Sequence, residues 1–106
     1  MKYFSIAEID VTDRIWVAAY VQEVTSLVER HGGRYLARTN NFEKMEGDGD
    51  SPQLVLLVEW PSREAAMQFY QSAEYQPFLQ ARLKGSRGQF YLVAGEDIGR
   101  RVRVKS

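Results

Sequence analysis

The chain has 106 residues, no cysteine, and 14 basic residues balanced by 14 acidic ones. This length predicts a single domain, and the lack of cysteine excludes a disulfide framework, a thiolate nucleophile and a thiolate metal site. The formal net charge of zero favours neither nucleic acid nor a membrane surface as a partner.

The first segment, "MKYFSIAEIDV", carries Lys2 but is interrupted by Ser5, Glu8 and Asp10. It therefore resembles neither a signal peptide nor a membrane span, and we expect a soluble cytoplasmic protein. The alternation of residues 2–10 between two faces predicts a first strand.

A helix is predicted next, over residues 14–30, because apolar residues recur there at helical spacing. Thr12 and Asp13 precede it as capping residues, and Gly32 stands where a helix usually ends in a left-handed residue. A second strand is predicted to start at Gly33 and to continue to residue 46 as one long arm.

The second half repeats this order. After a turn at 47–52, the very apolar segment 53–60 predicts a strand that Pro61 ends. Ser62 caps a predicted helix, and Ser72 begins another that reaches Gly85. Residues 89–95 predict the last strand.

The predicted order of strand, helix, strand, strand, helix, strand is the ferredoxin-like βαββαβ pattern of the α+β class. We expect one domain over residues 1–95, built as a four-stranded antiparallel sheet with helices on one face. A basic tail follows over 96–106, and it is predicted to be solvated or to add an edge strand.

Alternation along the strands divides the sheet into two faces. The face away from the helices is predicted to hold Phe4, Ile6, Glu8, Arg34, Leu36, Arg38, Val55, Leu57, Glu59, Tyr91 and Val93. Exposing a face with this many apolar residues to water is unfavourable for a monomer. The prediction is a homodimeric α+β barrel in which two such faces enclose a small space.

Several stretches resemble, in order and spacing, the bacterial family known as domain of unknown function 1330: "AEIDVTD" (7–13), "HGGRYLAR" (31–38), "LVEWPS" (57–62), "EYQ" (74–76) with "AR" (81–82), and "GQFYLVAG" (88–95). The resemblance implies a ferredoxin-like subunit of a dimeric α+β barrel, with no established activity for the family. The wider barrel class includes cofactor-independent oxygenases, small isomerases and dehalogenating enzymes, as well as proteins without known catalysis.

His31, the only histidine, ends the first helix on its apolar side. It has two interpretations: an acid or base that works near neutral pH, or a helix-end residue whose ring bonds backbone carbonyls. Gly32 and Gly33 are interpreted as residues that end the helix and open the next strand. A phosphate-binding loop is rejected, because it needs a longer glycine pattern that leads into a helix, whereas these glycines follow one.

Four charged residues are predicted to lie on neighbouring strands of the apolar face: Glu8, Arg34, Arg38 and Glu59. Buried charges are costly unless they are paired. One hypothesis is an anion site, in which the arginines bind a carboxylate or enolate and burial raises the pKa of Glu59 towards that of a general base. The other is a network of salt bridges across the dimer interface.

Tyr75 and Arg82 lie one or two turns apart on the last helix and form a further candidate ligand-binding pair, with core packing and surface ion pairing as the alternative. One histidine without cysteines supplies no dedicated transition-metal site, so no metal and no cofactor are expected.

Two functions remain open at this point, and the sequence does not decide whether the chain is an enzyme. The first is a barrel that binds a small anionic or carbonyl-bearing metabolite between sheet and helices and performs cofactor-independent proton-transfer or oxygenase-type chemistry. Glu59 is its base, His31 or Tyr75 its proton donor, and Arg34 and Arg38 bind the anion. The second is a non-catalytic dimeric binding or stress-related protein whose charges serve assembly.

Overall fold

The computed structural model describes residues 1–101. Its strands are β1 (Tyr3–Val11), β2 (Arg34–Thr39), β3 (Leu54–Trp60) and β4 (Ser86–Ala94). Its helices are the 3₁₀ turn η1 (Arg14–Trp16) followed by α1 (Val17–Arg30), α2 (Arg63–Gln71), α3 (Gln76–Gly85) and α4 (Ile98–Arg101).

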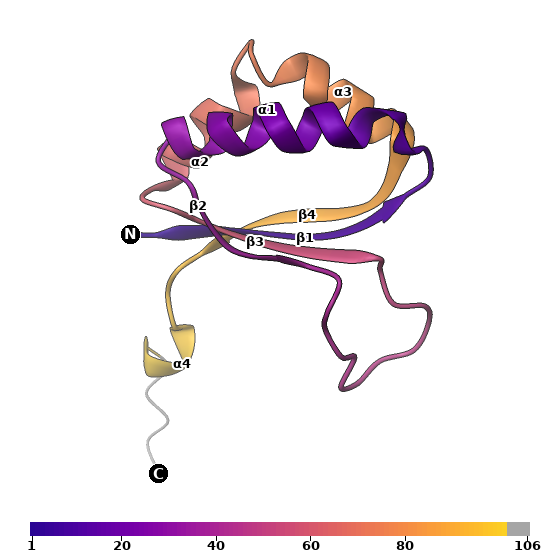
Figure 1. Ribbon diagram of the computed structural model, residues 1–106. Helices are drawn as coiled ribbons and strands as arrows, with labels where there is room; N and C mark the ends of the chain where they lie inside the picture. Colours follow the sequence, from indigo (N-terminus) through magenta and orange to yellow (C-terminus); the bar gives the residue numbers. More distant parts are fainter. Residues whose placement is uncertain (102–106) are drawn as a thin grey trace.

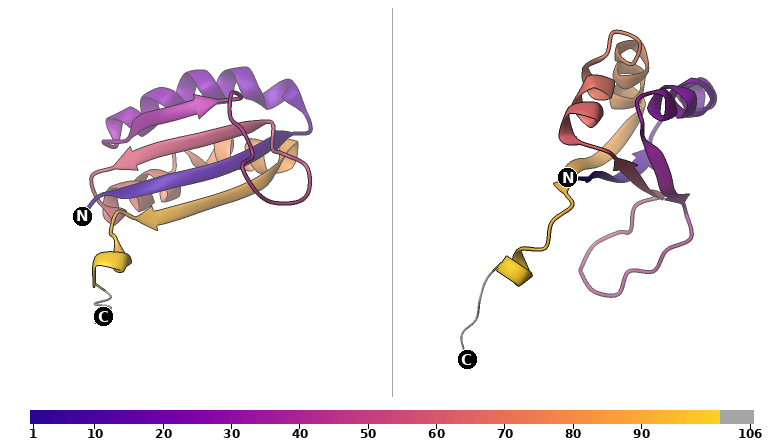
Figure 2. Two further views of the ribbon diagram at one scale, coloured as in Figure 1. Left: turned by 90° about the horizontal axis from the view of Figure 1, so that it is seen from below. Right: turned by 90° about the vertical axis from the view of Figure 1, so that its left-hand side faces the viewer.

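The four strands form one sheet in the order β2-β3-β1-β4, and every neighbouring pair is antiparallel. Helices α1, α2 and α3 all lie on the same face, and the other face carries no helix layer (Figures 1 and 2). The predicted ferredoxin-like α+β architecture is confirmed.

Helix α1 ends as its sequence predicts, but the first turn of the predicted helix, residues 14–16, is the 3₁₀ turn η1, and α1 begins only at Val17. The carboxylate of Asp13 accepts a hydrogen bond from the Ile15 amide at 3.0 Å and caps η1. At the other end, the Gly33 and Gly32 amides donate to the carbonyls of Val28 and Glu29. Gly32 has a φ of +88°, which a side chain would strain, so glycine is the residue that allows this helix end.

The hydrophobic core lies between α1, α2, α3 and strand β3. Its buried members are Val24, Leu27, Val28, Val58, Trp60, Ala66, Phe69, Tyr75 and Leu79. Gly33 allows the close approach of these layers, because a Cβ atom there would lie 2.6 Å from Val28 and 2.9 Å from Trp60. Each large apolar side chain buried here stabilises the fold by about 1.5–3 kcal/mol.

Strand β2 differs from its prediction. It ends at Thr39, whereas a long arm to residue 46 was expected with a bulge at Asn40–Asn41. The irregularity lies earlier, between Tyr35 and Ala37, where the register with β3 shifts by one residue. The extra residue, Leu36, reverses the alternation that follows it.

The C-terminal elements also differ in detail. Strand β4 starts at Ser86, three residues before the predicted strand, because Ser86–Gly88 continue the pairing with β1. The tail forms the short helix α4, with an ion pair of 3.5 Å between Asp97 and Arg100. The predicted edge strand falls mainly on residues 102–106, which lie outside the described residues.

Candidate functional site

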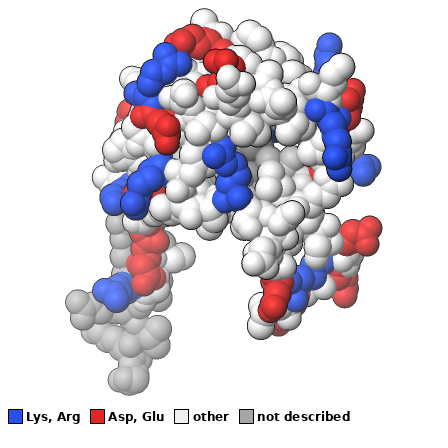
Figure 3. Space-filling view, in the orientation of Figure 1, with Lys and Arg blue, Asp and Glu red and all other residues white. Residues whose placement is uncertain are grey.

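A cavity of about 220 Å³ lies between the helix layer and the sheet. The space-filling view shows a hollow between these two layers, bordered mainly by uncharged residues (Figure 3). Its wall is largely aromatic and aliphatic, formed by Tyr20, Val24, Val28, Tyr35, Leu56, Trp60, Ala66, Met67, Phe69, Tyr70, Tyr75, Phe90, Tyr91 and Leu92, with Ser5. A concave, apolar site with few polar groups is typical of small-molecule binding.

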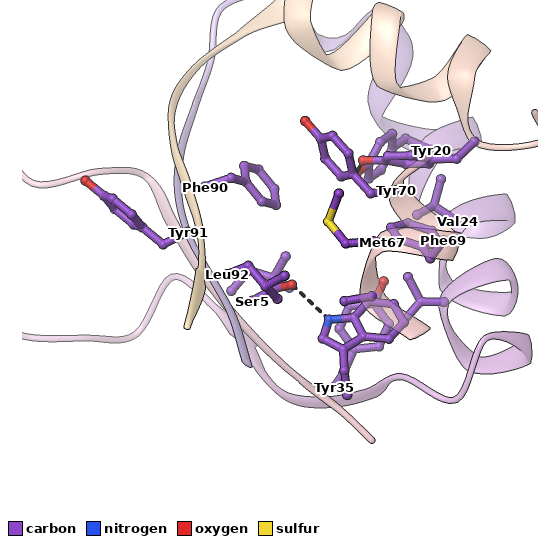
Figure 4. A pocket seen from close by; sticks show the side chains of 15 residues that line it. Ser5, Tyr20, Val24, Tyr35, Met67, Phe69, Tyr70, Phe90, Tyr91 and Leu92 are labelled. Carbon is purple, nitrogen blue, oxygen red and sulfur yellow. Dashed lines mark hydrogen bonds between the residues drawn. The ribbon is translucent and has the colours of Figure 1, made fainter. Parts of the chain in front are cut away.

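Two hydroxyl groups provide the main polar feature of this wall. The hydroxyl oxygens of Tyr20, from α1, and Tyr75, the residue before α3, lie 2.6 Å apart. Burial, and secondarily Tyr75, raise the pKa of Tyr20 well above its usual value, so its hydroxyl stays protonated at neutral pH. At the back of the cavity the Trp60 indole donates to Ser5 Oγ at 2.9 Å (Figure 4).

Arg82, on α3, adjoins the tyrosine pair and is 5% exposed. Its guanidinium carbon lies 4.1 Å from the centre of the Phe90 ring, and its Nε atom is buried without a hydrogen-bond partner. Within residues 1–101 no carboxylate forms a salt bridge with it. Burial acts to lower the pKa of Arg82, but Tyr75 and Tyr20 outweigh this effect and raise it. A charged guanidinium is therefore held in the interior without a counter-ion.

A second cavity, of about 70 Å³, adjoins the first. Both are lined by Tyr20, Tyr35, Leu56 and Phe90, so they lie next to each other between the layers. Arg82 and Arg38 line the smaller cavity.

The prediction that Arg38 lies beside Arg34 and Glu59 is wrong. Because the Leu36 bulge reverses the alternation, Arg38 pairs with Leu56 on the helix side of the sheet. There it donates to Thr25 Oγ1 at 2.7 Å and lies 4.1 Å over the Tyr35 ring.

The uncovered face of the sheet carries a smaller ionic cluster than predicted. Glu59 pairs with Lys2 and with Arg34, each at 3.1 Å. Glu8 stands farther along β1, opposite Val55 and Gln89, whereas Glu59 lies opposite Phe4. The cluster is therefore Lys2, Glu59 and Arg34, without Glu8 or Arg38.

The predicted rise in the pKa of Glu59 is also wrong. The hydrogen bond from Lys2 lowers this pKa most, the Arg34 charge lowers it further, and both outweigh the opposing effect of burial. At neutral pH the residue is a paired carboxylate, which suits an ion pair better than a general base.

His31 lies at the end of α1, outside both cavities. Its Nδ1 atom is 2.9 Å from the Leu27 carbonyl, to which a protonated Nδ1 donates, and its ring meets Phe69 edge-on at 6.0 Å. This geometry matches the helix-end interpretation of the residue.

Of the predicted site residues, Tyr75 therefore lines the larger cavity, and Arg82 and Arg38 line the smaller one. Sequence reasoning missed Tyr20, the partner of Tyr75, because it counted this residue as part of the apolar helix face. Its phenol was the available signal: a hydroxyl on a buried helix face needs a partner.

A four-stranded antiparallel sheet with helices on one face and a cavity between the layers defines a ferredoxin-like α+β domain. The chain belongs to the family described as Domain of unknown function (DUF1330), whose model matches residues 2–96. The resemblance found in the sequence is thereby confirmed.

Solved structures share the fold at low sequence identity. The chain is similar to a protein of unknown function from Rhodopseudomonas palustris, with a TM-score of 0.69 and 16% identity over 85% of this chain and 80% of that one. It is also similar to SnoaB, a cofactor-independent oxygenase from Streptomyces nogalater, with a TM-score of 0.64 and 12% identity over 91% and 94%.

An antibiotic biosynthesis monooxygenase gives a TM-score of 0.58 and 14% identity over 92% of this chain and all of that one. No curated protein matches the chain. Among residues 1–101, no helix combines the length and apolar character needed to cross a membrane.

Proposed function

We propose that this protein binds a small planar metabolite with a carbonyl, enol or anionic group in the cavity between the helices and the sheet. The observation that carries this proposal is the hydrogen-bonded hydroxyl pair of Tyr20 and Tyr75 in a mainly aromatic and aliphatic wall. Apolar surfaces would bind the body of such a ligand, and the hydroxyls would orient its oxygen atom.

We further propose that the bound molecule undergoes cofactor-independent proton transfer or oxygenation. In that role Tyr75 donates a hydrogen bond to the oxygen on which negative charge develops, and the nearby Arg82 charge stabilises it. Tyr75 and Arg82 thus replace Glu59 and His31, since neither of those lines the cavities. The fold shared with a cofactor-independent oxygenase is in keeping with this class of chemistry.

Binding is tested with 2-acetylnaphthalene, a planar ketone, in a titration followed by ¹H–¹⁵N NMR. In a Met67→Trp variant a larger ring fills space in the cavity wall, where Met67 points inward (Figure 4). The control is Met45→Trp, because Met45 is 84% exposed in the loop before β3. We expect wild type and the control to bind and Met67→Trp to lose binding, with amide shifts at the cavity wall. A wild type that does not bind, or binding that Met67→Trp leaves unchanged, would refute the proposal.

A second proposal concerns the uncovered face, on which Leu36, Tyr91 and Val93 are 45%, 54% and 39% exposed. We propose that this face packs against a second copy of the chain, and that Lys2, Glu59 and Arg34 serve that assembly. The observation in its favour is the pairing of Glu59, because paired charges can enter an interface at lower cost than single ones. Should the larger cavity bind nothing, this non-catalytic role would stand alone.

A further inference from the structure

We infer that the smaller cavity binds the negatively charged group of the ligand, with Arg82 on its inner side and Arg38 at its outer edge. The preferred ligand class is then a planar carboxylate whose apolar body occupies the larger cavity, and a neutral carbonyl compound of the same shape binds more weakly. This inference rests on the proposed function, because it assumes that the larger cavity is a binding site.

The buried charge of Arg82 is the first argument. The side chain is 5% exposed, its Nε atom has no hydrogen-bond partner, and no carboxylate within residues 1–101 pairs with it. The hydroxyls of Tyr75 and Tyr20 and the Phe90 ring contact the guanidinium, but they supply no counter-ion and leave Nε without a partner, and a buried polar atom without a hydrogen bond is unfavourable. An anion in the adjoining space would pair the charge and satisfy Nε.

The shape and composition of the smaller cavity are the second argument. Its 70 Å³ is the room that about two water molecules take up in the liquid, which is also enough for a carboxylate group. No acidic residue lines it, while two arginines do. The wall of this cavity is mainly apolar, but both charged residues that line it are cationic, so an anionic group is favoured there over a cationic one.

The closeness of the two cavities is the third argument. Tyr20 and Phe90 line both, so a ring that contacts these residues in the larger cavity lies next to the smaller one, and a short substituent on it would reach that space if the shared side chains give way. The larger cavity is mostly aromatic and suits a flat ring system.

Arg38 differs from Arg82 in being exposed, but its position is fixed by the bond to Thr25 and by its stacking on Tyr35. Such a guanidinium retains free N–H groups and has lost part of its side-chain freedom before the ligand arrives. Arg38 is therefore a positioning residue at the outer edge, and Arg82 makes the main contact.

The test compares naphthalene-2-carboxylate with naphthalene-2-carboxamide, which has nearly the same shape but no charge. Affinities are measured by NMR titration for wild type, Arg82→Met and the control Arg63→Met, because Arg63 is exposed and lines neither cavity. We expect wild type to prefer the carboxylate. Arg82→Met should weaken carboxylate binding about 10-fold or more, the range of a charge-assisted hydrogen bond, and leave carboxamide binding and the control unchanged.

Equal loss of both compounds in Arg82→Met, or no loss of either, would overturn the inference and leave the proposed function standing. Failure of wild type to bind either compound would refute the proposed function as well. If Arg82→Met does not fold, Arg82→Gln retains hydrogen-bond donors without the charge, and the same selective loss of carboxylate binding is expected.

Discussion

The hydroxyl oxygens of Tyr20 and Tyr75 lie 2.6 Å apart although the residues are separated by 55 positions in the sequence. This contact joins α1 to the start of α3 and adjoins both the larger cavity and the buried guanidinium. A hydrogen bond between the half-buried phenol of Tyr20 and the buried phenol of Tyr75 stabilises the fold, and under the proposed function it also orients the ligand. The two roles can be separated by measurement.

Removing one hydroxyl of this pair leaves the other without its partner. We expect Tyr20→Phe and Tyr75→Phe each to lower the free energy of unfolding by about 1–3 kcal/mol, and the double variant to lose less than the sum of the two. Urea unfolding measures these values. Tyr70→Phe serves as the control, because Tyr70 is 39% exposed and contacts Tyr75 only through its ring. Strict additivity in the double variant would contradict a direct bond between the hydroxyls.

Arg82 should contribute little to stability despite its burial. A long apolar side chain removes the desolvation cost of a cation without a counter-ion, but also its contacts with Tyr75, Tyr20 and Phe90. Because these effects oppose each other, the free energy of unfolding of Arg82→Met should lie within about 1 kcal/mol of that of wild type, as measured by urea unfolding. A loss of several kcal/mol would show that the guanidinium stabilises the fold itself, through contacts such as the Phe90 ring.

Glu59 should make the free energy of unfolding fall as the pH is lowered into the acidic range. Its pKa is lowered in the folded protein by Lys2 and Arg34, so the unfolded chain takes up this proton first as the pH falls. The stabilisation is therefore present above the unfolded pKa of about 4.3 and is lost as the pH falls through the lower folded value.

The variant Glu59→Gln should therefore be less stable than wild type at neutral pH and equal to it in strong acid. Urea midpoints measured between neutral and acidic pH test this expectation, with Glu46→Gln in the exposed loop as the control. An unchanged difference across the whole pH range would contradict the ion-pair assignment.

Association through the uncovered face should be sensitive to charge. Under the proposal of a second copy on this face, we expect wild type to sediment as a dimer and Val93→Lys as a monomer, because an unpaired ammonium group would be buried. Leu83→Lys on α3 is the matched control, since Leu83 is also exposed, at 54%, but belongs to the helix layer. A monomeric wild type at micromolar concentration would refute the assembly proposal.

The sequence predicts the fold well because its signals are local. The caps at Asp13 and Ser62 form as expected, with Ser62 Oγ accepting from the Ala65 amide at 3.1 Å. Alternation along β1 and β3 assigns their two faces correctly, as the pairing of Tyr3 with Trp60 and of Phe4 with Glu59 shows. Hydrophobic periodicity and helix capping depend on residues only a few positions apart, so both can be predicted from the sequence alone.

The candidate site was predicted only in part, because it depends on contacts between distant segments. Lys2 lowers the pKa of Glu59 although 57 positions separate the two residues in the sequence. No local pattern links them. Tyr20 needed a partner that only the packing of α1 against α3 supplies. The prediction for Arg38 failed at a bulge that no glycine or proline in "RYLART" marks.

The extra residue at Leu36 has a wider consequence. Strand β2 contributes Arg34 to the uncovered face and Arg38 to the helix side of the sheet, where it stays exposed beside the smaller cavity, although strict alternation over four positions would place both on one side. One backbone irregularity thus divides two guanidinium groups between the two sides of the sheet, one on the open face and one beside the helix layer. Insertion or deletion of a single amino acid here, with no change in composition elsewhere, would transfer a positive charge from one side to the other.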